Sequence, residues 1–363
     1  MPGMTMGMSV VAGGGDGALY SPAKDKAATR NSNPFFFFCN NVNNRSPPLR
    51  RTRQLLASAR IKVVLPLCFL FALILFAARA AQLMGWNHHA SSSTSLTASR
   101  AGYTVLINTW QRNPLLKQAV AHYASCSGTD AVHVVWSESD PPSESLIAYL
   151  KKIVLSKSQS AHKPNFRFDL NEEDYVNNRF KPIADLRTEA IFSVDDDVIV
   201  PCSTMEFAFS VWQSASNTMV GFVPRMHWLD EEKDGSTYYK YGGWWSVWWM
   251  GTYSMVLSKA AFFHKKYLDL YAHKMPSSIH DYVISERNCE EIAMSLLVAN
   301  ATRAPPIWVQ GKIYEIGASG ISSLLGHNRR RNKCLNDFIS LYGSVPLVPT
   351  HVKAVHALHE WFW

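Results

Sequence analysis

The chain has 363 residues, which is long enough for one large folded domain together with a tail and a membrane anchor. Its composition, 47% hydrophobic and 18% charged, is that of a globular protein and excludes a wholly disordered chain. The formal net charge of +8 is concentrated in residues 1–60, which carry +6 and leave only +2 for the rest. This distribution argues against nucleic acid as a partner of the folded part.

The N-terminal part predicts a tail and an anchor. Residues 1–60 are rich in Gly, Ser, Asn, Pro and basic residues, which predicts an unfolded cytosolic tail. An uncharged run from Val63 to Ala78 follows and predicts a transmembrane anchor at 61–84. Ala78-Arg79-Ala80 resembles a signal-peptide cleavage site, but the preceding sequence is too long for that alternative. Because the basic flank precedes the anchor, we expect a type II protein whose later residues are luminal.

Residues 85–101 predict a polar luminal stem, and the folded domain is expected at 102–363. Strands that alternate with helices indicate an α/β fold with a mostly parallel sheet, in which ligands bind at the carboxyl ends of strands. The predicted elements are strands at Tyr103–Asn108, Ala131–Trp136, Ala190–Val194, Met219–Val223 and Tyr253–Leu257, and helices at Leu115–Tyr123, Met205–Gln213 and Ala260–Tyr271.

An acidic triplet, Asp195-Asp196-Asp197, directly follows the third predicted strand and therefore lies at the carboxyl edge of the sheet. Side chains alternate along an extended segment, so Asp195 and Asp197 can face the same way. Two hard oxygen ligands that face a diphosphate suit Mn²⁺, with Mg²⁺ as the alternative. A solvated acidic turn or a calcium loop is the other interpretation, but the preceding strand and the predicted anchor favour an enzymatic metal site.

Two polar pairs precede the triplet and are candidate contacts for a nucleotide base and a phosphate. Asn108 and Arg112 follow the first strand, where an arginine suits bidentate contact with a phosphate oxygen. Asn178 and Arg179 lie shortly before Asp195. Surface positions explain either pair equally well.

Glu290 and Glu291 open an apolar pattern that predicts an amphipathic helix. Asn288 with Glu291 three residues later is also a capping-box arrangement, and acidic residues favour a helix N-terminus whatever the function. Spacing alone therefore favours a structural role over catalysis at this position.

Four tryptophans, Trp244, Trp245, Trp248 and Trp249, lie within six residues. Indole rings stack on sugars and also favour membrane interfaces, which suits an enzyme acting on a glycolipid acceptor; burial of some of them in the core is the alternative. The sequon that begins at Asn300 predicts glycosylation if this side is luminal.

The six cysteines contain no CxxC pair, which leaves a zinc ribbon unsupported. An oxidising lumen permits one or two disulfides, but spacing does not choose the partners.

From about Tyr103 onward the chain resembles the exostosin-like glycosyltransferases of family 64, and within them the plant branch that transfers mannose to glycosyl inositol phosphorylceramide. The plant branch is indicated by the segments Gly243–Trp249 and Lys312–Gly317. The stretches that carry the family resemblance are Phe192–Val198, Phe207–Trp212, Val220–Arg225, Thr252–Leu257 and Asn288–Met294.

The resemblance implies a single-domain, Rossmann-like fold of the glycosyltransferase A type and a reaction that retains anomeric configuration. It implies that Asp195 and Asp197 bind the metal and that Cys289 and Cys334 form a disulfide. Glu291 falls where the family carries its catalytic Asp, so an extra methylene displaces the carboxylate by about 1 Å. The residues implied to bind the donor are Asn108, Arg112, Asn178, Arg179, Asp195, Asp196, Glu290 and Arg331.

We therefore expect a retaining, metal-dependent hexosyltransferase that moves mannose from GDP-mannose to glycosyl inositol phosphorylceramide sphingolipids at the Golgi membrane. Transfer from UDP-N-acetylhexosamine or another UDP-sugar is the alternative within the family. A non-catalytic Golgi protein that binds calcium and glycans is the alternative from another class. The sequence leaves open a homodimer.

Overall fold

The computed structural model describes residues 62–77, 102–158, 165–232, 234–317 and 327–357. Residues 62–77 form a helix, and no helix among the described residues combines the length and the apolar character needed to cross a membrane. The predicted tail and stem, and parts of the predicted anchor, lie outside these ranges.

The chain divides into two compact units, Met1–Thr94 and Ser95–Trp363. Every buried side chain of the described residues belongs to the second unit, and so do both disulfides. The second unit therefore contains a complete hydrophobic core of its own and is a self-contained folding unit.

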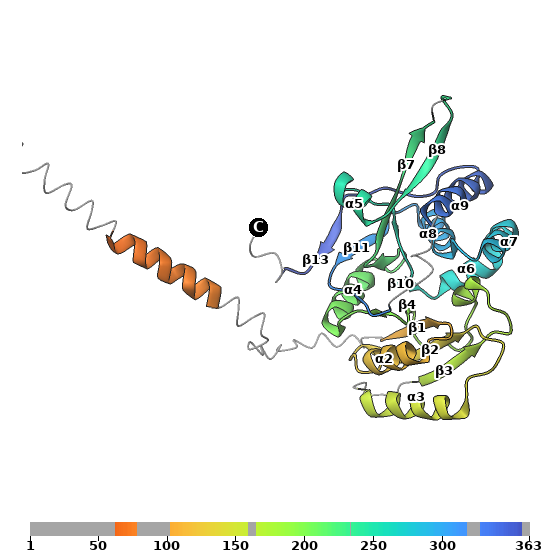
Figure 1. The fold of residues 1–363 in the computed structure, drawn as a ribbon, viewed down its shortest axis with the longest axis horizontal. Coiled ribbons are helices and arrows are strands. Elements are labelled where there is room, and N and C mark those ends of the chain that lie inside the picture. Colours follow the sequence, from red (N-terminus) through yellow and green to blue (C-terminus); the bar gives the residue numbers. More distant parts are fainter. Residues whose placement is uncertain (1–61, 78–101, 159–164, 233, 318–326, 358–363) are drawn as a thin grey trace, which may run out of the picture. The chain divides into compact units, whose positions relative to one another are not determined.

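A mixed sheet forms the centre of the second unit (Figure 1). Its order is β13-β11-β6-β10-β4-β1-β2-β3, and five of the seven neighbouring pairs are parallel. This confirms the predicted mostly parallel α/β sheet. The strands are β1 (Tyr103–Thr109), β2 (Thr129–Trp136), β3 (Asn165–Leu170), β4 (Ala190–Asp195), β6 (Val220–Gly221), β10 (Ala260–His264), β11 (Ile307–Gln310) and β13 (Lys353–Val355).

Helices cover both faces of the sheet because its strands are apolar on both faces. In β4, Phe192 and Val194 pack into one hydrophobic cluster and Ile191 into the other. The helices of the first cluster are α2 (Asn113–Tyr123), α3 (Glu144–Lys157) and α4 (Cys202–Ser214). Those of the second are α6 (Lys266–Lys274), α7 (Ser277–Glu286), α8 (Glu290–Thr302) and α9 (His327–Tyr342).

The predicted helix at Ala260–Tyr271 is wrong in its first half. Ala260–His264 is strand β10, which pairs antiparallel with β4 and β6, and α6 begins only at Lys266. A short apolar run such as Ala-Ala-Phe-Phe suits either element, and here the open hydrogen-bonding edges of two neighbouring strands favour the extended form.

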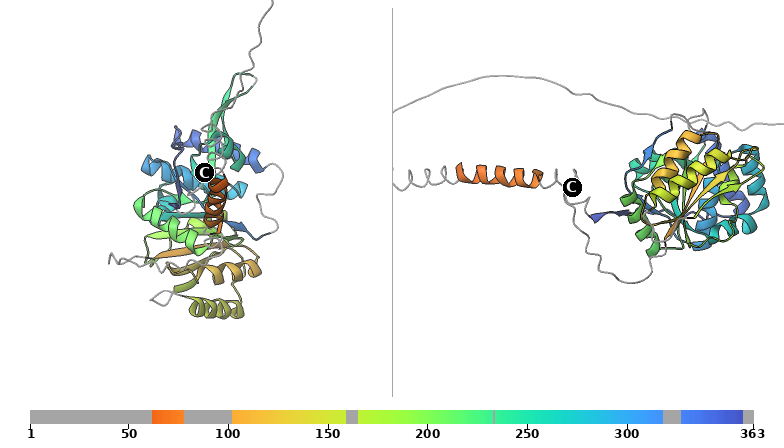
Figure 2. Two further views of the ribbon diagram at one scale, coloured as in Figure 1. Left: turned by 90° about the vertical axis from the view of Figure 1, so that its left-hand side faces the viewer. Right: turned by 90° about the horizontal axis from the view of Figure 1, so that it is seen from below.

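Smaller elements surround the carboxyl edge of the sheet. β5 (Val198–Ile199) pairs with β12 (Tyr314–Glu315), and a 3-10 helix, η1 (Val176–Phe180), precedes β4. β7 (Pro224–Glu231) pairs with β8 (Thr237–Gly242) and with β9 (Met255–Val256). β7 and β8 form a hairpin that projects from the domain (Figures 1 and 2), and α5 (Trp244–Met250) follows it directly.

Candidate active site

The acidic triplet lies at the carboxyl end of β4, beside the end of β1. Asn108 is opposite Asp195 in the parallel pairing, and its carbonyl oxygen accepts the amide hydrogen of Asp196 at 3.1 Å. The side chain of Asp196 is fully buried, whereas those of Asp195 and Asp197 are 24% and 20% exposed. The middle aspartate thus points into the protein and the outer two remain accessible, as the alternation of an extended segment predicts.

Two arginines hold the triplet in place. Arg179 is buried in η1 and its Nη2 donates to Asp195 Oδ1 at 2.7 Å. Arg112, at the N-terminus of α2, pairs through Nη1 with Asp197 Oδ2 at 2.8 Å and through Nη2 with Asp196 Oδ1 at 2.5 Å. Two guanidinium groups thus balance the charge of the three carboxylates, and guanidinium groups are also suited to bind phosphate oxygens.

Glu291 lies beside the triplet, at the start of α8. Its Oε1 accepts the backbone amide hydrogen of Lys259 at 3.0 Å, and the carbonyl oxygen of Lys259 accepts the amide hydrogen of Asp195 at 3.1 Å. The Lys259 peptide groups thus hold both the Glu291 carboxylate and the Asp195 backbone. No sequence motif marks Lys259, because its backbone amide and carbonyl make these contacts and its side chain does not. The sequence alone therefore did not identify this residue.

Arg331 of α9 completes the surroundings of Glu291. Its Nη2 donates to Glu291 Oε2 at 2.9 Å, and its Nη1 donates to the Tyr241 hydroxyl at 2.8 Å. The disulfide between Cys289 and Cys334 joins α8 to α9 next to these residues and is the pair that the resemblance implies. Tyr241, at the end of β8, is a further contact that no sequence pattern marked.

The predicted capping box is not formed. Cys289 is the N-cap of α8 with a left-handed backbone (φ 78°) and makes no side-chain capping bond, while Asn288 Oδ1 accepts from the Cys289 amide. The Glu291 carboxylate instead binds Lys259 and Arg331, and a helix-capping role does not explain these contacts. The helix is also not amphipathic, since Glu290–Ala299 is buried throughout as a core helix.

The two adjacent glutamates differ in protonation. Burial, together with the charge of Glu291, raises the pKa of Glu290. Burial also disfavours ionised Glu291, but Arg331 and Arg179 outweigh it and lower the pKa of Glu291. Glu291 is therefore a carboxylate at neutral pH and Glu290 is the group that holds a proton more readily.

Several buried polar atoms near these residues have no hydrogen-bond partner. Buried polar groups in native proteins are normally paired, so unpaired atoms gathered at one site indicate a polar ligand. They are Asn178 Oδ1, Arg179 Nε, Ser258 Oγ, Asn288 Nδ2 and Arg331 Nε.

A hollow of about 460 Å³ adjoins Asn178, at the carboxyl ends of β2 and β3. Its lining includes Asp169 and Asn171 from the end of β3 and Ile183 from the loop after η1. Its volume lies in the range of sites that hold small molecules of nucleotide size.

The donor set of the triplet fits a hard divalent cation. Two accessible carboxylates suffice, because Mn²⁺ or Mg²⁺ keeps waters and takes further oxygens from phosphates. Gly317 leaves room at this point: a Cβ there would lie 2.8 Å from Asp197 Cβ and 2.9 Å from its Oδ2. The Ile316 amide also donates to the Asp197 carbonyl oxygen at 2.7 Å, so the segment after β12 closes on the triplet.

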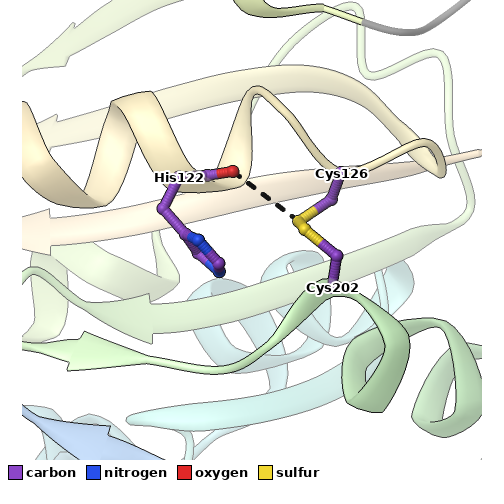
Figure 3. Close-up of side chains that lie close together, drawn as sticks. All are labelled: His122, Cys126 and Cys202. Carbon is purple, nitrogen blue, oxygen red and sulfur yellow. Dashed lines mark hydrogen bonds between the residues drawn. A yellow bond between two sulfur atoms is a disulfide. The ribbon is translucent and has the colours of Figure 1, made fainter. Parts of the chain in front are cut away.

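A second group of potential ligands, His122, Cys126 and Cys202, does not fit a metal. Cys126 and Cys202 form a disulfide beside His122 (Figure 3). His122 Nε2 lies 2.7 Å from the Val200 carbonyl oxygen. Bonded sulfurs are not available as thiolates, so this group is a structural link between α2 and α4.

Two further sets of predicted residues lie at the surface. The four tryptophans of α5 are all exposed, which contradicts the core alternative; only Val247 of that helix is buried. Asn300 is exposed on the last turn of α8.

Residues 103–359 match the glycosyl transferase family 64 domain. The chain belongs to this family. It is a glycosyltransferase, and the mostly parallel sheet agrees with the glycosyltransferase A type expected of the family.

Named relatives cover the chain to different extents. Glycosylinositol phosphorylceramide mannosyl transferase 1 of Arabidopsis thaliana is 53% identical over 315 residues, which are 86% of this chain and 94% of that protein. Exostosin-2 of Homo sapiens is 32% identical over 267 residues, covering 71% of this chain but only 34% of exostosin-2. A solved structure, the mannosyltransferase PcManGT from Pyrobaculum calidifontis in complex with GDP-Man and Mn²⁺, covers 67% of this chain and 64% of its own, with 11% identity and a TM-score of 0.41.

Proposed function

We propose that this family 64 enzyme transfers mannose from GDP-mannose to a glycosylinositol phosphorylceramide, with retention of configuration. The observation that carries the substrate proposal is the 53% identity to the plant mannosyl transferase over 94% of that protein's length. The reaction class is supported by the Lys259 backbone, which holds Glu291 and Asp195 side by side.

Asp195 and Asp197 would hold Mn²⁺, with Mg²⁺ as the alternative. A metal held there would supply positive charge to stabilise the departing nucleoside diphosphate. Arg112 and Arg179 supply positive charge next to Asp195 and Asp197. The buried Asp196 carboxylate holds Arg112 in place. Arg331 is the further candidate for contact with the diphosphate, and its buried Nε has no hydrogen-bond partner in the protein.

Glu291 would stabilise the positive charge that develops on the sugar ring as the glycosidic bond breaks. Its lowered pKa keeps it ionised for this purpose. The acceptor hydroxyl would attack from the face that the diphosphate leaves and pass its proton to the departing phosphate oxygen, so no covalent enzyme nucleophile is needed. Glu290, whose pKa is raised, is suited to donate a hydrogen bond to a sugar hydroxyl.

The hollow at β2 and β3 is the proposed place of the nucleoside. It shares Asn178 with the site, and Asn178 directly precedes the Asp195 partner Arg179. Asn108 lies on the same edge of the sheet. Transfer from a UDP-sugar is the alternative within the family.

We also propose a Golgi location with a type II anchor at 61–84, a cytosolic tail at 1–60, a stem at 85–101 and a luminal catalytic domain at 102–363. The exposed sequon Asn300 and the two disulfides suit a luminal, oxidising environment.

The deciding experiment incubates Ser95–Trp363 with GDP-mannose or UDP-N-acetylglucosamine, with and without Mn²⁺, on glycosylinositol phosphorylceramide. The expected result is a mannosylated lipid only with GDP-mannose and metal. A product from the UDP-sugar alone would establish the alternative donor, and consumption of neither donor would contradict the proposed reaction.

A further inference from the structure

Helix α5 carries an exposed aromatic surface that sugar transfer does not require. The side chains of Trp245 and Trp249 are 76% and 81% exposed, and those of Trp244 and Trp248 are also exposed. Single exposed apolar residues are ordinary, but a contiguous set of large ones marks an interaction surface.

The surface extends beyond α5. Trp308 of β11 packs edge-on against Trp244 with ring centroids 5.5 Å apart, and His351 Nδ1 lies 3.0 Å from the Gly251 carbonyl oxygen at the end of α5. Val352, which follows His351, is 74% exposed. We call the four α5 tryptophans with Trp308 and Val352 the tryptophan face.

The chain segments that supply the tryptophan face carry no acidic residue. The segments 243–258, 303–314 and 344–357, which supply the face, contain no Asp or Glu, but they do contain Arg303, Lys312 and Lys353. Lys353 Nζ lies over the Trp308 ring, 5.4 Å from its centroid. Apolar indoles with a lysine beside them match an anionic lipid surface, where tryptophan prefers the interface and basic residues meet lipid phosphates.

Two other possible ligands of this face, a sugar and a second copy of the chain, fit less well. A sugar-stacking platform needs an open flat ring with polar neighbours, but Trp245 and Trp248 stand at 88° to each other and Ser246 is the only polar side chain of α5. A second copy on a two-fold axis would bring two cationic borders together, which costs free energy.

We propose that the tryptophan face binds the surface of an anionic lipid bilayer and so holds the catalytic domain against the membrane. This goes beyond the transfer reaction: binding needs neither donor nor acceptor, so its failure and failure of the proposed function are separate results. A lipid acceptor would, however, lie at the same surface as the enzyme.

The test measures sedimentation of Ser95–Trp363 with vesicles of phosphatidylcholine alone or with phosphatidylinositol added. Binding should appear with the anionic vesicles, with a blue shift of tryptophan emission and quenching by brominated lipid. The double variant Trp245→Ser/Trp249→Ser should bind about 100-fold more weakly, about tenfold for each indole withdrawn from the interface. Tyr149→Ser/Leu155→Ser, which removes two exposed side chains of α3, is the matched control and should bind as the native protein does.

Three results would overturn the proposal. The first is equal binding by native protein and the tryptophan variant, or no binding by either. The second is an emission shift with a soluble inositol phosphoryl glycan and no vesicles, which would assign the face to a sugar. The third is a native dimer in sedimentation velocity that the tryptophan variant disperses. Because both indoles are exposed, an unchanged thermal midpoint should show that the variant folds.

Discussion

The donor edge of the sheet and the tryptophan face are built in opposite ways. The donor edge consists of the acidic triplet, Glu291 and the buried Arg179 and Arg331. There, Arg179 pairs with Asp195, Arg331 pairs with Glu291, and the Lys259 backbone amide also binds Glu291. The tryptophan face contains no acidic side chain and only Val247 of α5 is buried. A site that must place charge to within an ångström needs buried, paired groups, whereas a surface that meets a fluid bilayer needs only apolar area and the right sign of charge.

The largest expected effect is that of replacing Glu291, at the centre of the donor edge. Glu291→Gln keeps the shape and the bond from the Lys259 amide but removes the negative charge, so kcat should fall on the order of 10³-fold. Donor affinity, measured by calorimetry with Mn²⁺, should stay within about threefold. Retained kcat in this variant would remove Glu291 from the mechanism.

Removal of either disulfide should lower stability, but removal of only one of them should also lower activity. Each encloses a long stretch of chain, 76 residues for Cys126–Cys202 and 45 for Cys289–Cys334, so replacing either pair with serine should cost about 2–4 kcal/mol of unfolding free energy. Only the second pair joins α8 to α9, and only its loss should also reduce kcat measured well below the melting temperature. Equal kcat losses for the two variants would show that this link does not position Arg331 and Glu291.

Gly317 tests how closely the chain must approach the triplet. Gly317→Ala places a methyl group 2.8 Å from Asp197 Cβ, so the Mn²⁺ concentration for half-maximal activity should rise several-fold, roughly 1 kcal/mol of binding. Gly243→Ala is the matched control, because a Cβ there meets nothing within 4 Å. An identical metal dependence in both variants would place the metal away from Asp197.

The smallest expected effect is a change in the pH dependence of stability. Because the pKa of Glu290 is raised in the folded protein, the folded state binds more protons than the unfolded one above the unfolded pKa of about 4.3. This contribution is fully favourable at low pH and is lost as pH rises through the folded pKa. Glu290→Gln should therefore gain stability relative to the native protein as pH increases, as chemical denaturation at pH 5 and pH 8 would measure. A constant difference at the two pH values would show that Glu290 titrates normally.

Much of the donor edge could be predicted because its motifs are local. Apolar strands that end in Asp195-Asp196-Asp197 place the carboxylates by the topology of an α/β sheet alone. The role of Glu291 could not be read from spacing, since Asn288 and Glu291 also form a capping pattern. Only the fold shows that the Glu291 carboxylate faces Lys259 and Arg331, 32 and 40 residues away.

The tertiary structure also corrected two local predictions for the same reason. The Ala260–His264 run became a strand because β4 and β6 offered free edges on both sides. Helix α8 became a core helix because it lies within the second hydrophobic cluster. The sequence by itself determined the class of fold, the acidic triplet and the exceptional tryptophan content of α5, all of which are local patterns. The tertiary structure decided which of these patterns meet: Lys259 between Asp195 and Glu291, Arg331 on Glu291, and Trp308 beside Trp244. These contacts join residues far apart in the chain, and the packing of the sheet and helices sets their geometry.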